Sequence, residues 1–460
     1  MSWKDQTRDS CNGFYTIRTE DTGDVPVRLF LTPALLDAVE ESIYPQIINA
    51  TRFPGVKLVA ITPDVHHGYG VPIGTVLLTD ADTGAVAMGP VGFDIGCGMV
   101  SASSDVPANA ATPENRLRFN REVTRRIALG PGRVSRTKLK DLTRVDFEDI
   151  VRGGAAFYLE RYDSPVDRGN TERDVIPVSD DWQPPWGGPG RPERGVPQLG
   201  TLGGGNHFIE LQENVGNGNL YVQMHSGSRG FGHGLATNYF QLARAQNPAI
   251  KALDLGYFTP DSPHYAGYLN AVAAGANFAI VNRLAMFEQL ALAFEEVFHK
   301  PLRLVYEISH NLVQREQHPE FGWVHVHRKG ATRAFPAGHG ALAGTQWAEH
   351  GHPILIPGSN RDASFILRAL PGASASGYSV NHGAGRRMSR RAARKAFTQA
   401  DVNAAYREAG IVVNTDGVVP IDESKDVYKS SREVVEAVTR AGLATVEHEL
   451  RPLASIKGSD

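Results

Sequence analysis

The chain of 460 residues carries 47 basic and 50 acidic side chains, and its net charge of −3 excludes a protein that binds nucleic acid over its whole surface. A hydrophobic share of 41% fits a globular protein with a large core, and no apolar stretch is long enough to cross a membrane. Two cysteines cannot make a disulfide framework, and the amino-terminal residues lack the apolar core of a signal peptide. We therefore expect a cytoplasmic protein with no membrane partner.

Strands and helices are predicted along the chain without the regular alternation of a parallel α/β sheet. Short apolar runs predict strands at residues 56–62, 71–78 and 86–88. A helix is expected over residues 113–144, broken at Gly130-Pro131-Gly132, and a last helix over residues 432–441. This mixture predicts an α+β fold.

Residues 265–299 form the clearest predicted helix. Phe278 and Val281 belong to an apolar stripe at helical spacing, which is typical of a core-facing surface. Asn277 and Asn282 interrupt the apolar run, and we expect them to be capped or exposed.

Residues 164–197 are poor in aliphatic side chains and rich in proline and glycine. This composition predicts a long surface loop or insertion, and it marks the best candidate for a boundary within the chain.

Five glycine-rich loops follow short apolar runs and present a histidine, a cysteine or a carboxylate. They lie at residues 92–98, 203–207, 224–230, 308–311 and 381–385. Backbone N–H groups in such loops can bind phosphate, and the side chains suit a transition metal. The combination indicates a metal-dependent enzyme that acts on phosphate.

Each loop also has a structural interpretation when it is taken alone. Asp94 and Cys97 can point at one metal centre, or they can be a turn aspartate and a buried structural cysteine. His207 with Glu210, and His310 with Asn311, can serve a pocket or pack as satisfied polar pairs.

Two further histidines head polar loops. His225 begins His-Ser-Gly-Ser-Arg-Gly, a candidate cradle for phosphate, and His382 precedes Gly-Ala-Gly, where a neutral imidazole can act as a nucleophile. His325 and His327 share one strand face but precede Arg328-Lys329, so they are left out of the metal set. The segment Asp64-Val65-His66-His67 is equally ambiguous.

Two basic segments are candidate patches for nucleic acid, at residues 116–144 and 386–395. Each could instead be a solvated helix face. The chain has no Gly-x-x-x-x-Gly-Lys-Ser/Thr loop, which argues against a standard P-loop nucleotide site.

The order of the motifs resembles the RtcB family of GTP-dependent RNA ligases. The resemblance rests on Pro63-Asp64-Val65-His66 with Gly68-Tyr69-Gly70, and on residues 91–98, 202–210, 225–230, 310–311, 327–332, 357–359 and 382–385. It runs from about residue 25 to Lys457, nearly the whole chain.

The resemblance implies one large α+β domain over residues 1–460, in which mixed β-sheets and flanking helices surround a cleft for metal and nucleotide. It also implies a ligase that joins RNA ending in a 2′,3′-cyclic phosphate or a 3′-phosphate to RNA with a 5′-hydroxyl end, as in tRNA splicing or RNA repair. The implied cofactors are GTP and two Mn²⁺ ions, which Zn²⁺ or another divalent ion could replace. The implied partners are these RNA ends and an archease-type activator.

The resemblance also implies roles for individual residues. Cys97 would bridge two metal ions, with Asp94 and His207 on one ion and His225 and His310 on the other. His382 would take GMP from GTP. The implied contacts to the nucleotide are Asn206, His207, Phe208, Ile209, Glu210, His310, Asn311, Pro357, Gly358, Ser359, Asn360, Ser364, His382, Gly383, Ala384, Gly385, Tyr428 and Lys457.

The chain departs from the family pattern at three places. Asn360-Arg361-Asp362 stands where the family usually has Met-Gly-Thr, Asn381 replaces the usual cysteine before the nucleophile, and the segment near Trp186 looks like an insertion. Two alternatives therefore remain open. One is a relative that caps 3′-phosphate ends with GMP without efficient sealing, and the other is a relative that binds RNA without turnover.

Overall fold

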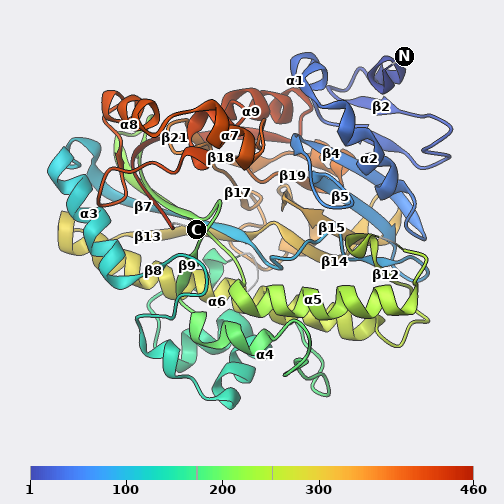
Figure 1. Ribbon diagram of the computed structural model, residues 1–460, viewed down its shortest axis with the longest axis horizontal. Coiled ribbons are helices and arrows are strands. Elements are labelled where there is room, and N and C mark those ends of the chain that lie inside the picture. Colours follow the sequence, from blue (N-terminus) through green and yellow to red (C-terminus); the bar gives the residue numbers. More distant parts are fainter. Residues whose placement is uncertain (1, 172–174, 251, 459–460) are drawn as a thin grey trace.

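The computed structural model describes residues 2–171, 175–250 and 252–458, and Figure 1 shows its ribbon. Two large β-sheets and several flanking helices confirm the predicted α+β class. The α-helices are α1 (Pro33–Ala38), α2 (Tyr44–Thr51), α3 (Pro113–Arg126), α4 (Arg144–Arg161), α5 (Arg229–Gln246), α6 (Tyr265–Phe298), α7 (Arg390–Ala396), α8 (Gln399–Glu408) and α9 (Ser431–Arg440).

The strands of the first half are β1 (Thr7–Asp9), β2 (Tyr15–Ile17), β3 (Val27–Leu29), β4 (Val56–His66), β5 (Ile73–Asp80), β6 (Val86–Ala87), β7 (Gly98–Pro107), β8 (Ala128–Leu129), β9 (Thr201–Gly203), β10 (Phe208–Asn214) and β11 (Asn219–Ser226). The later strands are β12 (Tyr257–Phe258), β13 (Arg303–Ser309), β14 (Asn311–His318), β15 (Gly322–Lys329), β16 (Ala331–Arg333), β17 (Pro353–Ile356), β18 (Ser364–Ala369), β19 (Ser379–Asn381), β20 (Val412–Val413) and β21 (Ala444–Lys457). Three short 3-10 helices are used below: η5 (Arg168–Asn170), η6 (Pro192–Gln198) and η10 (Ile421–Glu423).

The two large sheets meet where β13 runs into β14. The first sheet has the order β1-β2-β3-β4-β5-β15-β14, and the second has the path β13-β7-β11-β10-β21-β18-β17. Both β13 and β14 are edge strands, and only His310 separates them. His310 therefore lies at the junction of the two sheets.

Helix α6 confirms the clearest sequence prediction and packs against α4, α5 and the second sheet (Figure 1). It ends where His299 takes a left-handed conformation, with φ of 57°, and Pro301 follows. Phe278 and Phe294 are fully buried on it, and each such side chain contributes about 1.5–3 kcal/mol of hydrophobic stabilisation.

The expectation that Asn277 and Asn282 are capped or exposed is wrong, because both are completely buried. The Asn282 side chain accepts from the backbone N–H groups of Gly200 and Thr201 and donates to the carbonyl of Gly227. A buried amide can satisfy backbone groups of loops that no strand pairs, and here it fixes the loop after β11.

The helix predicted over residues 113–144 is shorter than expected. Thr112 caps α3 and Pro113 begins it, but α3 ends at Arg126, and positive φ angles at Gly130 and Gly132 turn the chain away. The sequence analysis missed α4, where Thr143 and Asp146 form a capping box.

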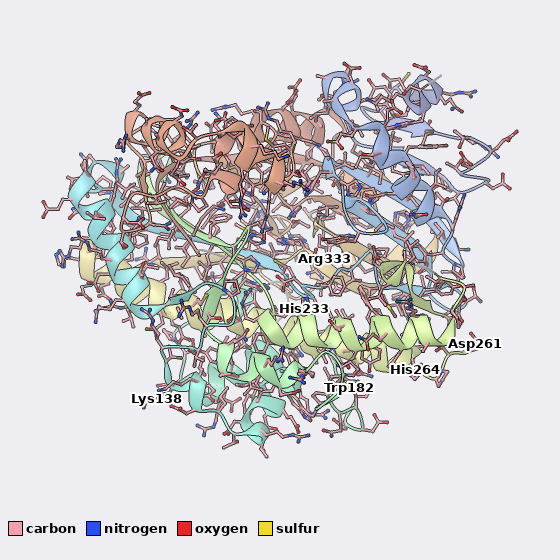
Figure 2. The ribbon with its side chains drawn as sticks, in the orientation of Figure 1. Lys138, Trp182, His233, Asp261, His264 and Arg333 are labelled. Atoms are coloured by element: carbon pink, nitrogen blue, oxygen red, sulfur yellow. The ribbon has the colours of Figure 1, made fainter. Side chains whose placement is uncertain are left out.

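The described parts of residues 164–197 are not a simple surface loop, since they form η5 and most of η6 and pack against α5 and α6. The Trp182 indole N–H donates to the Tyr239 hydroxyl of α5, and Figure 2 shows Trp182 close to that helix. One cluster of buried side chains contains Phe119, Trp182 and Ile456, so this segment joins the core formed by the chain on both sides of it.

Among the residues that the structure describes, no helix combines the length and the apolar character that a membrane span requires.

Candidate functional site

Neighbouring strands of the second sheet bring one cysteine and three histidines together. Cys97 comes directly before β7, His207 directly before β10, and His225 lies on β11 between these two strands. The register pairs His225 with Met99 on one side and with Phe208 on the other. Since β13 pairs with the other edge of β7, His310 reaches the same point.

The ligand atoms form two groups that share the Cys97 sulfur. Cys97 with His225 and His310 is one group, and Cys97 with Asp94 and His207 is the other. The sulfur lies 3.2 Å from His225 Nε2 and 3.4 Å from His207 Nε2. His225 Nε2 lies 3.2 Å from His310 Nε2, and His207 Nε2 lies 3.2 Å from an Asp94 oxygen.

The hydrogen bonds behind His225 leave its inner nitrogen available to a metal ion. His225 Nδ1 donates to the Asn206 carbonyl at 3.1 Å, so Nε2 carries a lone pair. His207 Nδ1 likewise lies 3.0 Å from the Leu202 carbonyl, but the Arg229 guanidinium is 2.9 Å from the same nitrogen. Both contacts cannot be hydrogen bonds at once, and the Leu202 bond is the one that a metal-bound His207 needs.

Burial sets the charge of the cluster. It lowers the pKa values of His225 and His310 well below the usual value, so both imidazoles are neutral. Burial and the Asp94 charge raise the pKa of the Cys97 thiol well above its usual value. Although burial opposes it, hydrogen bonding with His207 keeps the pKa of Asp94 low. Neutral imidazoles, a carboxylate and a thiol that a cation would ionise fit a divalent transition metal.

Arg283 of α6 holds the segments that carry the cluster, and the sequence analysis did not predict this role. This fully buried guanidinium pairs with the fully buried Glu307 and donates to the carbonyls of Gly96 and Ser226 and to the Ser309 hydroxyl. These residues precede Cys97, follow His225 and precede His310, so one side chain holds three ligand-bearing segments. A charged residue within an apolar helix was the signal in the sequence.

His382 lies next to the cluster and is held by Asp64. The ring centroids of His310 and His382 are 4.7 Å apart. His382 Nδ1 donates to an Asp64 oxygen at 2.7 Å, and the Thr62 hydroxyl donates to the other Asp64 oxygen at 2.6 Å. Although Asp64 is buried, these partners lower the pKa of its carboxyl, so it stays ionised and holds a proton on His382 Nδ1, which places the lone pair of a neutral imidazole on Nε2.

Two glycines allow the backbone to approach this pair. A side chain at Gly385 would begin 2.2 Å from the Asp64 carbonyl oxygen, and one at Gly330 would begin 2.8 Å from the His382 ring. Both have positive φ, which is costly for any other residue. The loop after His382 and the turn before β16 therefore need glycine.

A cavity of about 260 Å³ opens beside His382 and His225. Of the residues expected at the nucleotide, it is lined by Asn206, Phe208, Glu210, Pro357, Gly358, Ser359, Asn360, His382, Gly383, Ala384, Gly385, Tyr428 and Lys457. His66, Arg386, Arg390 and Glu423 also line it. We call this cavity the base pocket.

Five expected residues do not line the base pocket. Ile209 is in the hydrophobic core, because alternate residues of β10 face opposite sides and Phe208 and Glu210 take the pocket side. Ser364 lies one layer behind, where its hydroxyl accepts from the Gly358 N–H and from Gln212. The other three are His207 and His310, which face Cys97, and Asn311, whose side chain donates to the Asp94 carbonyl.

The floor of the base pocket carries a buried carboxyl and a buried ammonium group. Burial raises the pKa of Glu210 to about 8, although Gln212 and Lys457 act against this shift. The Lys457 ammonium lies 3.2 Å from Glu423, to which the Tyr428 hydroxyl also donates. The pocket therefore offers an acceptor and a cationic donor close together.

Asn360 presents a donor to the base pocket. The Lys425 N–H donates to the Tyr406 hydroxyl, and that hydroxyl donates to Asn360 Oδ1. This chain of bonds leaves Asn360 Nδ2 buried and without a partner among the described residues, and the Ser359 hydroxyl is in the same state. Buried polar groups usually have a partner, and a bound molecule is one way to supply it.

The basic segment after His382 is not a plain solvated face. Arg386 and Arg390 both pair with Glu423, and Arg394 pairs with Asp422 on η10. Arg390 also lines the base pocket, so it is a candidate contact to the nucleotide as well as to nucleic acid. Among the described ion pairs, Arg391 and Lys395 have no carboxylate and remain exposed.

His325 and His327 lie outside the cluster, as expected. His327 is buried and accepts from the Ala87 N–H, and His325 meets the Tyr265 hydroxyl. Asp64, by contrast, was ambiguous in the sequence, and only the fold brings it to His382.

Comparisons with known proteins agree on one family. The family described as "tRNA-splicing ligase RtcB" matches residues 46–458. The chain is similar to the tRNA-splicing ligase RtcB of Methanococcus maripaludis, with 30% identity over 95% of this chain and 96% of the relative. It is also similar to the RNA-splicing ligase RtcB of Mycobacterium tuberculosis, with 34% identity over 90% and 100%, and to the tRNA-splicing ligase RtcB of Nanoarchaeum equitans, with 33% over 96% and 98%. With a family match over most of its length and relatives above 30% identity, the chain belongs to the RtcB family.

Proposed function

We propose that this protein is a GTP- and manganese-dependent RNA ligase that joins 2′,3′-cyclic phosphate or 3′-phosphate ends to 5′-hydroxyl ends through a histidine–GMP intermediate. One observation carries the proposal. His382, with Nε2 free, lines the base pocket and lies next to His310 of the Cys97 cluster.

In the first step His382 Nε2 attacks the α-phosphorus of GTP. A P–N bond forms, the bond to the β-phosphate oxygen breaks, and pyrophosphate leaves. Asp64 holds the Nδ1 proton and stabilises the imidazole as positive charge develops on it. Bound at Asp94, Cys97, His207, His225 and His310, divalent ions would supply positive charge against the triphosphate.

The base pocket suits guanine. When ionised, Glu210 can accept from the N1–H and the amino group of guanine, and the Lys457 ammonium can donate to O6. Asn360 Nδ2 and the Ser359 hydroxyl offer further hydrogen bonds, which makes up for the departure from Met at position 360.

The later steps transfer GMP to the RNA. The 3′-phosphate oxygen attacks the phosphorus on His382, the P–N bond breaks, and an RNA-phosphate–GMP anhydride forms. The 5′-hydroxyl of the second RNA then attacks the 3′-phosphate, and GMP leaves. A 2′,3′-cyclic end must first be opened by water to a 3′-phosphate.

The test is a ligation assay with two labelled RNAs, one ending in a 3′-phosphate and one beginning with a 5′-hydroxyl, with and without GTP and Mn²⁺. We expect a joined product only when both are present. RNA that accumulates as the GMP-capped form would show that the enzyme stops before sealing. An absence of both capped and joined RNA would rule out the proposed activity.

An archease-type activator and a cytoplasmic location belong to the same proposal. The activator rests on the family resemblance, and the location rests on the low cysteine count. A rise in the ligation rate when an archease is added to the assay would support the first of them.

A further inference from the structure

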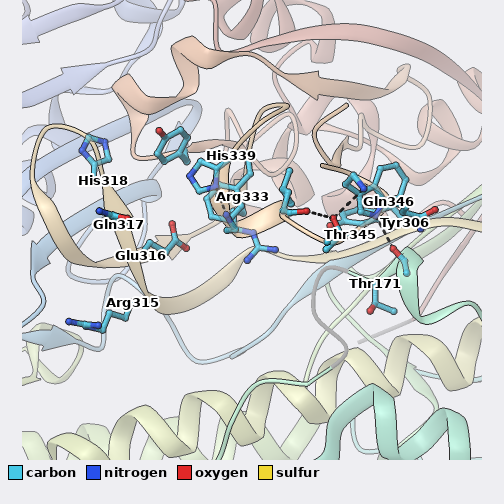
Figure 3. Close-up of a pocket in the computed structure, with 18 of the residues that line it drawn as sticks. Thr171, Tyr306, Arg315, Glu316, Gln317, His318, Arg333, His339, Thr345 and Gln346 are labelled. Carbon is cyan, nitrogen blue, oxygen red and sulfur yellow. Dashed lines mark hydrogen bonds between the residues drawn. The ribbon is translucent and has the colours of Figure 1, made fainter. Parts of the chain in front are cut away.

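A second and larger cavity, of about 1360 Å³, lies along the outer edge of β14. Figure 3 shows Arg315 and His318 of β14 on one side, Tyr306 and Gln346 on the other, and Arg333 and His339 between them. We call this cavity the edge groove. Pockets for small molecules usually measure about 300–1,000 Å³, so a space of this size better suits a segment of a polymer.

The edge groove begins close to the proposed nucleophile. β16 pairs with β19, so that Arg333 faces Ser379 and Ala331 faces Asn381, the residue before His382. The Ala331 N–H also donates to the His310 carbonyl. Arg333 is only two residues further along the strand, about 7 Å at the usual rise.

Planar side chains form layers inside the groove. The Arg333 guanidinium lies over the Phe335 ring at 4.7 Å, and the His339 ring stacks on Phe335 at 3.9 Å. Tyr378 meets His339 edge-on at 4.6 Å. Burial lowers the pKa of His339, so it stacks as a neutral ring. His339 is the half-exposed ring of this layer, so a nucleic-acid base can stack on it.

The rim of the groove carries an exposed tryptophan under a cation. Trp323 is 48% exposed at the start of β15, and the Arg315 guanidinium lies 4.4 Å above its ring. Arg315 is itself exposed, with Asp82 at 3.5 Å. An exposed indole beside an arginine can stack a base and meet the neighbouring phosphate.

Arginine side chains line the groove at three positions, Arg168, Arg315 and Arg333. Arg168 and Arg315 are exposed, so a phosphate in the groove can reach their guanidinium groups. The Glu316 carboxylate, which also lines the groove, is held by two hydrogen bonds from the buried Arg328, at 2.7 and 2.9 Å.

We propose that the edge groove binds a single-stranded stretch of the RNA substrate next to its reacting end, by stacking bases on its rings and contacting phosphates with its arginines. The inference rests on the proposed function, and it adds a binding surface outside the metal cluster and the base pocket. The strand could be the one that carries the 3′-phosphate or the one that carries the 5′-hydroxyl.

Trp323→Ala and Arg315→Ala test the groove, because both side chains are exposed and their loss should not disturb the core. We expect each variant to bind a single-stranded 3′-phosphate or 5′-hydroxyl RNA about tenfold more weakly in fluorescence anisotropy. For Arg315→Ala the dependence of log K on log salt should flatten by about 0.7. Formation of the His382–GMP adduct without RNA should not change.

Leu292→Ala and Arg18→Ala are matched controls, since these side chains are 52% and 79% exposed, on α6 and just after β2, and neither lines the groove. They should bind RNA like the unaltered protein. If the groove variants bind RNA as tightly as these controls while the unaltered protein ligates, the groove is not an RNA site. If the unaltered protein neither caps nor ligates, the proposed function fails instead.

Photo-crosslinking of the unaltered protein gives a readout that does not depend on a variant. RNAs with 4-thiouridine at successive positions from the reacting end should crosslink to peptides that contain Trp323 or residues 339–347. Two sets of RNA, with the label in the 3′-phosphate strand or in the 5′-hydroxyl strand, identify which strand lies there. Crosslinks confined to α7 and the base pocket in both sets would overturn the proposal.

Discussion

Asp64 is the residue whose change should separate nucleotide binding from chemistry. Asp64→Asn removes the charge that holds the Nδ1 proton of His382, and we expect adduct formation to slow by 10²- to 10⁴-fold, on the order seen when similar aspartates are neutralised. GTP affinity should hardly change, because the Asp64 side chain does not line the base pocket.

The rate of GMP incorporation, measured by intact mass, checks this expectation. Asp105→Asn on β7 is a suitable control, because Asp105 is 73% exposed. A full rate for Asp64→Asn would mean that His382 does not depend on this hydrogen bond.

The raised pKa of Glu210 predicts that nucleotide binding depends on pH. Its pKa is raised to about 8 by burial, so it is mostly protonated at pH 7, whereas guanine needs the ionised form as an acceptor. Affinity should therefore fall as the pH falls below 8, and GMP should bind roughly eightfold more tightly at pH 8.5 than at pH 7.

Calorimetry with GMP, in buffers of different ionisation enthalpy, measures this effect and the proton released on binding at pH 7. Glu210→Gln should flatten the profile. Equal affinities at both pH values, with no proton release, would show that Glu210 is not the acceptor.

The sequence predicted the residues that cluster at the candidate site better than the residues that support them. Cys97, His207, His225 and His310 stand in recognisable loops, and the fold brings their side chains together. The only signal for Arg283 was a charge within an apolar helix, because its ion pair with Glu307 forms only in the fold. Ile209 was misplaced because a motif does not tell which face of a strand each residue takes.

At the level of elements, we expect different side chains of α7 to contact the nucleotide and the RNA. Arg390→Ala should slow adduct formation, since Arg390 lines the base pocket and pairs with Glu423. The double variant Arg391→Ala with Lys395→Ala should keep that rate but bind RNA more weakly, with a salt slope lower by about 0.7 for each lost phosphate contact.

The two measurements are a salt series of RNA binding and a time course of GMP incorporation. If the double variant binds RNA normally at every salt concentration, the outer face of α7 is only a solvated surface.

Elements with a strong local pattern were predicted, and those defined by distant partners were not. The stripe on α6 predicted its bounds closely, because helical spacing is a local property. Helix α4 has a weak stripe, and the packing of Trp182 against Tyr239 could not be seen from a segment rich in proline and glycine.

At the scale of the whole molecule, binding of Mn²⁺ at the Cys97 cluster should raise the free energy of unfolding. The ligands of this cluster come from distant segments of the second sheet and from His310 at the junction of the two sheets, so the site exists only in the folded chain. At a Mn²⁺ concentration about 100 times the Kd, binding should add about 2.7 kcal/mol to the free energy of unfolding. Cys97→Ser should lose most of this gain, because a hydroxyl bridges metal ions poorly.

Thermal unfolding after chelation and after addition of Mn²⁺ gives this difference directly. A melting temperature that Mn²⁺ does not raise in the unaltered protein would contradict a metal site at these residues.

The α+β class followed from the mixture of local patterns, but the arrangement of the sheets did not. The meeting of β13 and β14 at His310 depends on pairing between strands that are about 200 residues apart in sequence, such as β7 and β13. The resemblance to the RtcB family supplied the expected cleft, and the pairing of strands explains why the ligands meet there.

The central claim is that His382 accepts GMP. The protein should be incubated with GTP and Mn²⁺ without RNA, and its intact mass and peptides should be measured. We predict one GMP on each chain, linked to the His382 imidazole, labile in acid, and absent from His382→Ala. A GMP adduct on another residue, or none after the metal has been restored, would contradict the account.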